Sequence, residues 1–543
     1  MGENQLRPLI LVRGFGGVDV SGEQSSPYQG FNDGTVYPGR RGDNYIYEGF
    51  LLRALKSSRF RYHDATNVIG YYAKDVEAPD EAGGFSPEAV AGTVVIDPAT
   101  AERVLANGTR GTIWVYRYYD LTPRALDRYG DGLRRLIELI SEAAEKRGEV
   151  FDGVDILAHS MGGLVVREAI RHLDQAAKGS AKTLIHRIVT LGTPHRGIAF
   201  QRMPDWLLRR LPGAARAGDE MAAFDPTETT FLQIERSDLF DLDRVLTVVG
   251  TNYRTYGTSV ASFGNRISSL LDDGSLQYNR SDGLVKQSSA QLPGAPRTFV
   301  HKCHGGEDSL VTSREAYEIA MRFFHGSHKI KLWLDRADIR RGGDWFGRSE
   351  FYFAVSVKPR FVDFELFHQS PEAENCYGPF RETDLSDDLA DLAQELRKPL
   401  ADRGDDTTGW AGPDRLIWEG WIDANAKPEA GQGLVFRLDV YVGERDSRGV
   451  GFSDNVVFRK QYYVQAFPGE ELRLFVHTGE EHLRGKNAPD AQALEAMARA
   501  EVSAPVQLPI PTEAPGPSGT GEWTFEVTGT GFEATLRLAV EQA

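Results

Sequence analysis

The chain has 543 residues, of which 41% are hydrophobic and 26% charged, so we expect about three domains or one large and one medium domain. The composition is that of a soluble globular protein, and no apolar run approaches the roughly 20 residues that span a bilayer. The net charge of −16 is uneven, with −3 over residues 1–325 and −13 over residues 326–543, and no basic stripe favours nucleic acid as a partner. Only Cys303 and Cys376 occur, which excludes a disulfide framework.

The N-terminus shows no signal peptide, since its apolar run is short and has the pattern of a core strand. We therefore expect a cytoplasmic protein, with a secreted form whose signal has been removed as the alternative. The acidic second half would be repelled by an anionic membrane unless cations intervened.

The first strand pattern is the apolar run from Leu9 to Val12, which is typical of a central parallel strand. A glycine-rich turn, residues 13–17, follows it. Glycines let the backbone bend tightly and leave an N–H pointing into a cleft, so the N–H of Phe15 is a candidate oxyanion donor. A plain glycine turn is the alternative. Residues 19–43 are rich in Gly, Pro and Ser, and we expect a long loop there.

Up to residue 146 the chain alternates between helix and strand patterns. We expect helices at 45–55 and 124–146, strands at 66–72 and 112–116, and an insertion at 74–110. The second helix opens after Thr122-Pro123, and its apolar residues fall on one face.

A strand pattern then leads into Ser160, and two glycines and an amphipathic helix follow. This order is typical of a nucleophile elbow, in which a strained turn presents a serine hydroxyl. The residues two positions before and two positions after the serine must be small, because the strand and the helix nearly touch there. In this sequence they are Ala158 and Gly162. The N–H of Met161 and the helix N-terminus would then point at an oxyanion. An ordinary strand–turn–helix is the alternative.

After the elbow we expect strands at 184–191, 245–250 and 297–300 and a helix at 313–325. The alternation of strands and helices over residues 1–325 predicts a doubly wound, mostly parallel sheet, with ligands at the carboxyl ends of the strands. Residues 198–240 carry an apolar stripe from Trp206 to Leu211. A lid over the site and a surface helix packed on the core are equally compatible with it.

From about residue 328 apolar and polar residues alternate between clusters of Gly, Pro and Asp. We expect strands at 329–334, 351–357, 416–422, 434–442, 456–464 and 472–477, and a hairpin of 523–527 with 532–540. This pattern predicts an antiparallel β-sandwich, and hence two domains, 1–327 and 328–543. Helices are expected at 385–400 and 490–500, and a Pro/Gly-rich connector at 503–521.

A serine hydroxyl becomes a nucleophile when a base, usually a histidine held by a carboxylate, takes its proton. Asp282, in an Asp-Gly turn before a short apolar run, is the favoured acid, and Asp272, Asp273 and Asp308 compete with it. An Asp-Gly turn without chemistry is the alternative.

His304 is the favoured base, because it lies among glycines beyond the last strand and can reach over the sheet edge. His301 lies closer to that strand, and we expect it to be packed. A zinc cluster of His301, Cys303 and His304 is a further alternative, but no second ligand pair stands at a matching spacing.

Three motifs together make residues 1–325 resemble the α/β-hydrolases, specifically the bacterial lipases and esterases. The elbow sequence AHSMGG at 158–163 is similar to that of small Bacillus lipases. The stretches GTPHRG at 192–197 and DGLV at 282–285 resemble those of larger Pseudomonas and Burkholderia lipases. The resemblance does not extend to residues 326–543.

In those larger lipases the aspartate of the DGLV stretch is the triad acid and the base follows at a similar separation, which implies Asp282 and His304 here. Arg13 stands where the family usually has histidine. Gly306 stands where these lipases have a calcium-binding aspartate, so that metal site is not carried over. His195, within the GTPHRG stretch, is expected to be structural.

The sequence thus predicts a carboxylic-ester hydrolase, an esterase or lipase, that works through an acyl-enzyme without a cofactor. Ser160 attacks, His304 acts as base and acid, Asp282 orients the imidazole, and the N–H groups of Phe15 and Met161 hold the oxyanion. A phospholipase or an acyltransferase with the same triad, and a lipid- or protein-binding module on an inactive scaffold, are the alternatives. We expect an ester or lipid substrate and transient contact with a lipid surface.

The second half contains acidic segments that could bind calcium. Residues 344–352 weakly resemble the first acidic loop of calcium-dependent phospholipid-docking sandwiches, and Glu444, Asp446 and Asp454 could form a second loop. Because the spacing is irregular and the aspartates are few, solvated turns are the favoured alternative.

Overall fold

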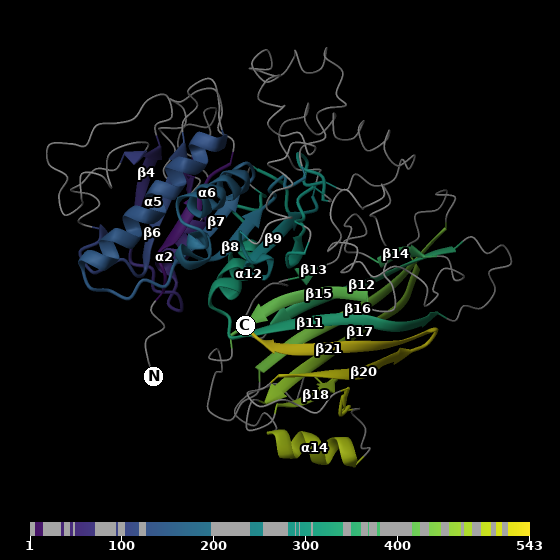
Figure 1. Ribbon diagram of the computed structural model, residues 1–543. Coiled ribbons are helices and arrows are strands. Elements are labelled where there is room, and N and C mark those ends of the chain that lie inside the picture. The colour runs from purple at the N-terminus through teal and green to yellow at the C-terminus, as the bar shows by residue number, and fades with distance from the viewer. Residues whose placement is uncertain are drawn as a thin grey trace, which may run out of the picture. The chain divides into compact units, whose positions relative to one another are not determined.

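The computed structural model (Figure 1) describes residues 6–14, 34–36, 44–46, 49–70, 94–95, 104–118, 126–196, 239–252, 281–287, 289–292, 294–305, 308–339, 349–359, 367–368, 377–380, 415–423, 434–446, 455–467, 472–479, 490–500, 506–512 and 520–543. The chain divides into two compact units, residues 1–297 with 302–320 and residues 298–301 with 321–543. That the parts expected at 1–327 and 328–543 fold independently stays a prediction. Among the helices described, none is both long and apolar enough to cross a membrane.

The largest sheet described has eight strands, in the order β10-β9-β8-β7-β1-β6-β4-β5. In that order the strands are Arg297–Val300, Val245–Gly250, Ile185–Leu191, Val154–His159, Leu9–Val12, Thr112–Tyr118, Asp64–Gly70 and Val94–Val95. From β9 to β4 neighbouring strands are parallel, and the short β5 pairs antiparallel with β4. The chain starts in the middle of the sheet and winds outward to both edges, which confirms the doubly wound α/β fold.

Helices α2 (Phe50–Lys56), α5 (Leu126–Lys146), α6 (Gly162–Ala176), α7 (Ser180–Leu184) and α12 (Arg314–His325) and the short η3 (Leu242–Arg244) connect the strands. Figure 1 shows α5 and α6 side by side against the sheet. The two helices approach closely at Gly130, where a Cβ would lie 2.4 Å from the Cβ of Glu168. Their buried faces join β1, β6 and β7 in one apolar core, as amphipathic helices on a sheet should.

Two local expectations differ from the structure. The helix expected at 45–55 begins only at Phe50, because Asn44–Ile46 forms β3 and pairs with β2 (Gly34–Val36). The five-residue α7 was not expected, since it is too short to show a helical period. Residues 198–238 of the candidate lid, most of the loop at 19–43 and the helix expected at 385–400 lie outside the described residues.

The second unit contains two antiparallel sheets. One has the order β15-β11-β21-β20-β19, and the other has the order β13-β12-β16-β17-β18 with β14 also paired to β12. The first comprises Arg415–Ile422, His328–Ile339, Phe532–Gln542, Gly521–Gly529 and Ile510–Pro511. The second comprises Phe367–His368, Ser349–Pro359, Leu434–Asp446, Asn455–Phe467 and Arg473–His477, with β14 at Tyr377–Phe380. Ile510–Pro511 is thus a short strand inside the expected connector at 503–521.

Aromatic side chains join the two sheets face to face. The ring of Phe532 on β21 lies 5.1 Å from that of Phe458 on β17 and 5.9 Å from that of Phe353 on β12. Trp418 on β15 and Phe436 on β16 lie 6.3 Å apart. These contacts bury one face of each sheet, as the alternating pattern predicts, and they confirm a sandwich-like architecture.

The described acidic residues of the proposed calcium loops lie in a strand. Glu444 is buried within β16, opposite Phe351 on one side and Asn455 on the other, and Asp446 ends the same strand. The expectation that they belong to a loop is therefore wrong, because the β16–β12 pairing extends further than the apolar alternation. Residues 344–348 and Asp454 lie outside the described residues.

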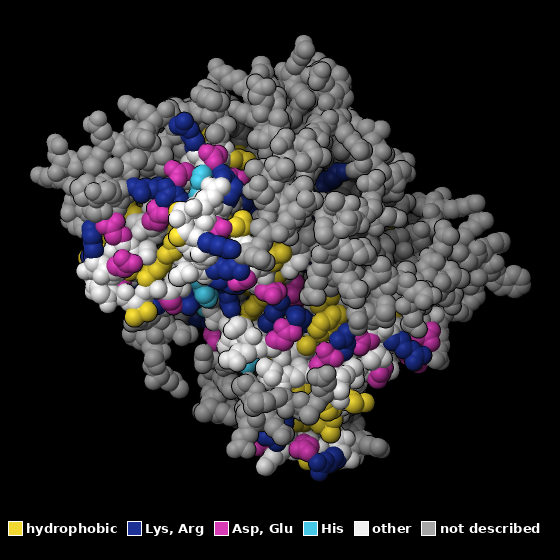
Figure 2. All heavy atoms as spheres, viewed as in Figure 1, with side chains coloured by type: hydrophobic (Ala, Val, Ile, Leu, Met, Phe, Trp, Pro, Cys, Tyr) yellow, Lys and Arg dark blue, Asp and Glu magenta, His cyan; other side chains and the backbone are white. Residues whose placement is uncertain are grey.

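On the face shown in Figure 2, basic and acidic side chains of the described residues are interspersed. They do not gather there into one basic patch.

Candidate active site

The turn between β7 and α6 holds Ser160 in an unusual backbone conformation. Its φ is +52°, and no other described residue except glycine has a positive φ. Such a conformation costs a residue with a Cβ about 1–3 kcal/mol, and it persists where the surroundings enforce it. Here the Ser160 N–H donates to the carbonyl of Leu191 at 2.9 Å, which ties the turn to the end of β8. This is the geometry of a nucleophile elbow.

Neighbouring segments approach the elbow too closely for side chains. A Cβ on Gly162 would lie 2.3 Å from the carbonyl oxygen of Arg13, and one on Gly14 would lie 2.7 Å from the Cβ of Ser160. A Cβ on Gly163 would lie 2.3 Å from the hydroxyl of Thr193, which donates to the Ser160 carbonyl at 2.8 Å. These glycines let the loop after β1, the loop after β8 and the start of α6 meet around the serine.

Three residues predicted from the sequence come together in one hydrogen-bonded chain. The Oγ of Ser160 lies 2.8 Å from Nε2 of His304, and Nδ1 of His304 lies 2.8 Å from Oδ2 of Asp282. All three side chains are buried. With Nδ1–H donating to the carboxylate, Nε2 carries a lone pair that accepts the serine proton. The competing Asp308 is paired instead with Lys302 at 2.7 Å, and Asp272 and Asp273 lie outside the described residues.

The Asp282 carboxylate is held on both oxygens. Its Oδ1 accepts the backbone N–H groups of Leu284 at 3.0 Å and Val285 at 2.7 Å, while Oδ2 faces His304. Gly192 lies against this pair, since a Cβ there would lie 2.8 Å from Oδ2 and 3.1 Å from Nδ1 of His304. The glycine after β8 therefore permits the contact between acid and base, a role that the sequence motif did not reveal.

One expected oxyanion donor lies within the described residues. Met161 is the first residue after the serine, is buried, and lies at the N-terminus of α6. Among the described backbone groups no carbonyl accepts its N–H. The other donor, Phe15, lies outside the described residues, although Arg13 and Gly14 bring the loop to the elbow.

His195 has the surroundings of a structural residue. It is 1% exposed, its ring lies 3.0 Å from the Thr190 hydroxyl, and its carbonyl accepts from the Arg167 guanidinium at 2.9 Å. Burial, and then the charge of Arg167, lower the pKa of His195 well below its usual value. The ring is therefore neutral, and the hydrogen bonds of His195 do not involve Ser160, His304 or Asp282.

His301 and Cys303 do not support the zinc alternative. His301 is exposed, so the expectation that it is packed is wrong: it lies one residue past the end of β10 and already belongs to the loop. Cys303 is buried, with its Sγ 2.8 Å from the carbonyl oxygen of Asp308. His304 is engaged with Ser160 and Asp282. The side chains of His301, Cys303 and His304 therefore do not converge on one site that could hold a zinc ion.

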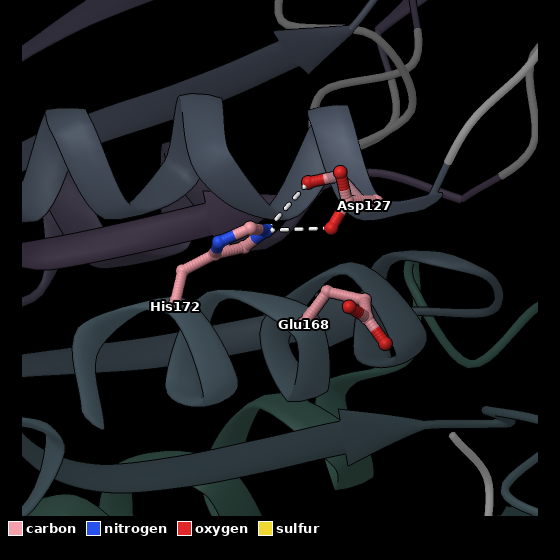
Figure 3. Close-up of side chains that lie close together, drawn as sticks. All are labelled: Asp127, Glu168 and His172. Carbon is pink, nitrogen blue, oxygen red and sulfur yellow. Dashed lines mark hydrogen bonds and ion pairs between the residues drawn. The ribbon is translucent and has the colours of Figure 1, made fainter. Parts of the chain in front are cut away.

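One cluster of metal-ligand type occurs among the described residues, and it lies between α5 and α6. Figure 3 shows Asp127, Glu168 and His172, with the His172 ring 3.0 Å from an Asp127 carboxylate oxygen. Arg171 pairs with both carboxylates, at 2.8 Å for Glu168 and in a short contact with Asp127. The Arg171 guanidinium already bridges the two carboxylates, so we assign the cluster to the pairing of α5 with α6.

The sequence did not single out His159, which contacts the base directly. The rings of His159 and His304 lie 4.9 Å apart, and Nε2 of His159 lies 2.9 Å from the carbonyl oxygen of His304. Burial, and then the neighbouring His304 ring, lower the pKa of His159 to about 3. The only feature of the sequence that could have pointed to this role is the position of His159 directly before Ser160.

The two neutral buried histidines, His159 and His195, should make the protein less stable in acid. Their pKa values are depressed in the folded protein, whereas in the unfolded chain both titrate near about 6.5. Below that pH the unfolded state binds more protons, so the free energy of unfolding falls by up to about 1.4 kcal/mol per pH unit for each group. This contribution is fully present above about pH 6.5, and the part that comes from His159 is lost as the pH falls to about 3.

Urea unfolding of wild type and His195→Phe at pH 7 and pH 5 measures the effect. The variant lacks one titrating group, so its stability depends less on pH than that of wild type. The amount by which its free energy of unfolding falls below the wild-type value should therefore be about 2 kcal/mol smaller at pH 5 than at pH 7. An equal deficit at both pH values would contradict a neutral, buried His195.

Comparison with known proteins agrees with the fold of this region. Residues 119–207, which include β7, the elbow, α6 and β8, match the family described as PGAP1-like alpha/beta domain. Together with the sheet order and the Ser160 turn, this match gives the first unit the α/β-hydrolase fold that the motifs predicted. Among the curated proteins none matches the chain.

Solved structures similar to this chain include lipolytic enzymes. A Bacillus licheniformis lipase in its propeptide form has 13% identity and a TM-score of 0.26, over 74% of this chain and 93% of that chain. A phospholipase from Legionella pneumophila has 12% identity and a TM-score of 0.29, over 72% of this chain and 90% of that chain. Likeness at these TM-scores carries no argument about the activity of this protein, which must come from the site.

Proposed function

We propose that the protein is a serine hydrolase that cleaves carboxylic esters, lipid esters included, through an acyl-enzyme on Ser160. The observation that carries the proposal is the unbroken hydrogen-bonded chain from Ser160 through His304 to Asp282. A serine that merely stabilised a turn would not need a buried imidazole and a buried carboxylate aligned behind it.

The chemistry follows from the protonation pattern. Ser160 Oγ bonds to the carbonyl carbon of the ester as its proton passes to Nε2 of His304, and the carbonyl electron pair moves to oxygen. The carbon–oxygen bond to the alcohol then breaks, and His304 gives the proton to the departing alcohol. Water repeats the sequence on the acyl-enzyme and releases the acid.

The residues around Ser160 support each charge that develops. Asp282 stabilises the imidazolium through Nδ1–H, and its own charge is held by two backbone N–H groups. In this proposal the N–H of Met161, which directly precedes α6, and the positive end of that helix stabilise the oxyanion. The N–H of Phe15 is the second donor in this proposal.

A fluorophosphonate probe tests the assignment. The probe phosphonylates only a serine that a neighbouring base activates, so peptide mass spectrometry should place the adduct on Ser160. Ser160→Ala should not be labelled, whereas Ser141→Ala, which removes another buried hydroxyl on α5, should react as wild type does. An adduct on a different residue, or an unreactive wild type, would contradict the proposal.

A further inference from the structure

The backbone of His304 is fixed at both of its polar groups. Its N–H donates to the carbonyl of Asp282 at 2.8 Å, and its carbonyl accepts from Nε2 of His159 at 2.9 Å. Its ring is fixed as well, by Asp282 on Nδ1 and Ser160 on Nε2. His304 is thus held at four points, and His159 supplies one of them.

The position of His159 in the chain gives this contact a particular consequence. His159 is the last residue of β7 and is joined covalently to Ser160. A hydrogen bond from its ring to the His304 carbonyl therefore ties the loop that carries the base to the segment that carries the nucleophile. If the loop after β10 shifts, the bond resists separation of Nε2 from Oγ.

The protonation state of His159 suits this task. To donate from Nε2 as a neutral ring, His159 must carry its proton there and leave Nδ1 unprotonated. Burial, and then the neighbouring His304, lower its pKa to about 3, so it stays neutral at ordinary pH. A neutral ring 4.9 Å from His304 adds no positive charge that would oppose formation of the imidazolium.

We infer that His159 is a positioning residue that holds His304 in register with Ser160, through its Nε2–H bond to the His304 backbone and the packing of the two rings. The role rests on the proposed function, since it acts through the base of that reaction. His159 itself neither accepts nor gives the reacting proton.

Two substitutions at His159 distinguish the contribution of its hydrogen bond from the contribution of its ring packing. His159→Phe keeps a flat ring but removes the donor, whereas His159→Gln places an amide donor near the position of Nε2. We expect His159→Phe to lower kcat for a soluble nitrophenyl ester about 10- to 100-fold with KM within about twofold, because a displaced base slows proton transfer. His159→Gln should recover most of that loss. His195→Phe, which removes a buried histidine whose hydrogen bonds do not involve His304, should keep wild-type kcat at a temperature below its melting transition.

A spectroscopic measurement reads the same contact without turnover. In wild-type protein labelled with ¹⁵N-histidine, the signals of His159 are identified as those missing from the spectrum of His159→Phe. They should show a neutral ring that is protonated on Nε2 and does not titrate between pH 5 and 8. A ring that titrates near its ordinary pKa, or that carries its proton on Nδ1, would overturn the inference.

The outcomes separate this inference from the proposed function. If fluorophosphonate fails to label Ser160, the hydrolase proposal fails, and the NMR result still decides the His159–His304 contact. If Ser160 is labelled but folded His159→Phe turns over as wild type does, the positioning role fails while the hydrolase stands. A raised KM at unchanged kcat would also overturn it, because it would assign His159 to substrate binding.

Discussion

Ser160→Ala should lower kcat/KM for a soluble ester by about 10⁴-fold or more, with the fold intact. The loss is large because the other groups of the site cannot supply a nucleophile: Asp282 faces away on the far side of His304, and Thr193 donates to the Ser160 carbonyl. Steady-state kinetics with a nitrophenyl ester, together with circular dichroism of the variant, measures the effect. Residual turnover near the wild-type value would remove Ser160 from the mechanism.

Ser160→Gly is the matched variant that tests the elbow strain. Both replacements remove the hydroxyl, but only glycine adopts a φ near +52° without a Cβ penalty. We expect both to be inactive and the glycine variant to be more stable than the alanine variant by about 1 kcal/mol in urea unfolding. If the alanine variant were the more stable, the strained turn would not describe the protein in solution.

His304→Ala should be nearly as inactive as Ser160→Ala, whereas His301→Ala should retain activity. His304 bridges Ser160 and Asp282 at 2.8 Å on each side, so its removal leaves no base for the serine proton. His301 is exposed, so its truncation should change stability by less than about 0.5 kcal/mol. Parallel kcat/KM and melting measurements on the two variants compare neighbouring histidines of the same loop.

Asp282→Asn adds a third comparison to this pair. An asparagine can accept from the imidazole or offer it an N–H, so the tautomer that leaves Nε2 free is no longer fixed, and kcat should fall by about 10⁴-fold. If His301→Ala were the inactive variant and His304→Ala the active one, the base would have been assigned to the wrong histidine.

The sequence predicted the local elements of this protein well. Short apolar, strand-like runs placed β7, β9 and β10, and an amphipathic pattern placed the helix after Ser160. The small residues around the serine predicted a close approach that Gly162 now shows. These features depend on a few neighbouring residues, so the linear pattern contains them. The start of α2 was misplaced because β3 depends on pairing with β2, a partner that a local pattern does not include.

Tertiary structure decided which of the candidate residues meet. Ser160 and His304 are separated by 144 positions, and they meet because β7, β8, β9 and β10 lie in order in one sheet with the loops after β7 and β10 at the same edge. The same arrangement places Asp282 rather than Asp308 behind His304, leaves His301 exposed, and brings Gly192 against the acid–base pair.

The sequence alone therefore predicted the functional groups of the site: a serine in an elbow, an aspartate in an Asp-Gly turn, and a histidine in the loop after the last strand of the first sheet. The contacts that orient these groups were not, above all the bond from His159 to the His304 carbonyl. The type of a residue determines which of its atoms can donate or accept a proton. Only the packing of distant segments fixes distances near 3 Å, because the relevant partners are neighbours in space and not along the chain.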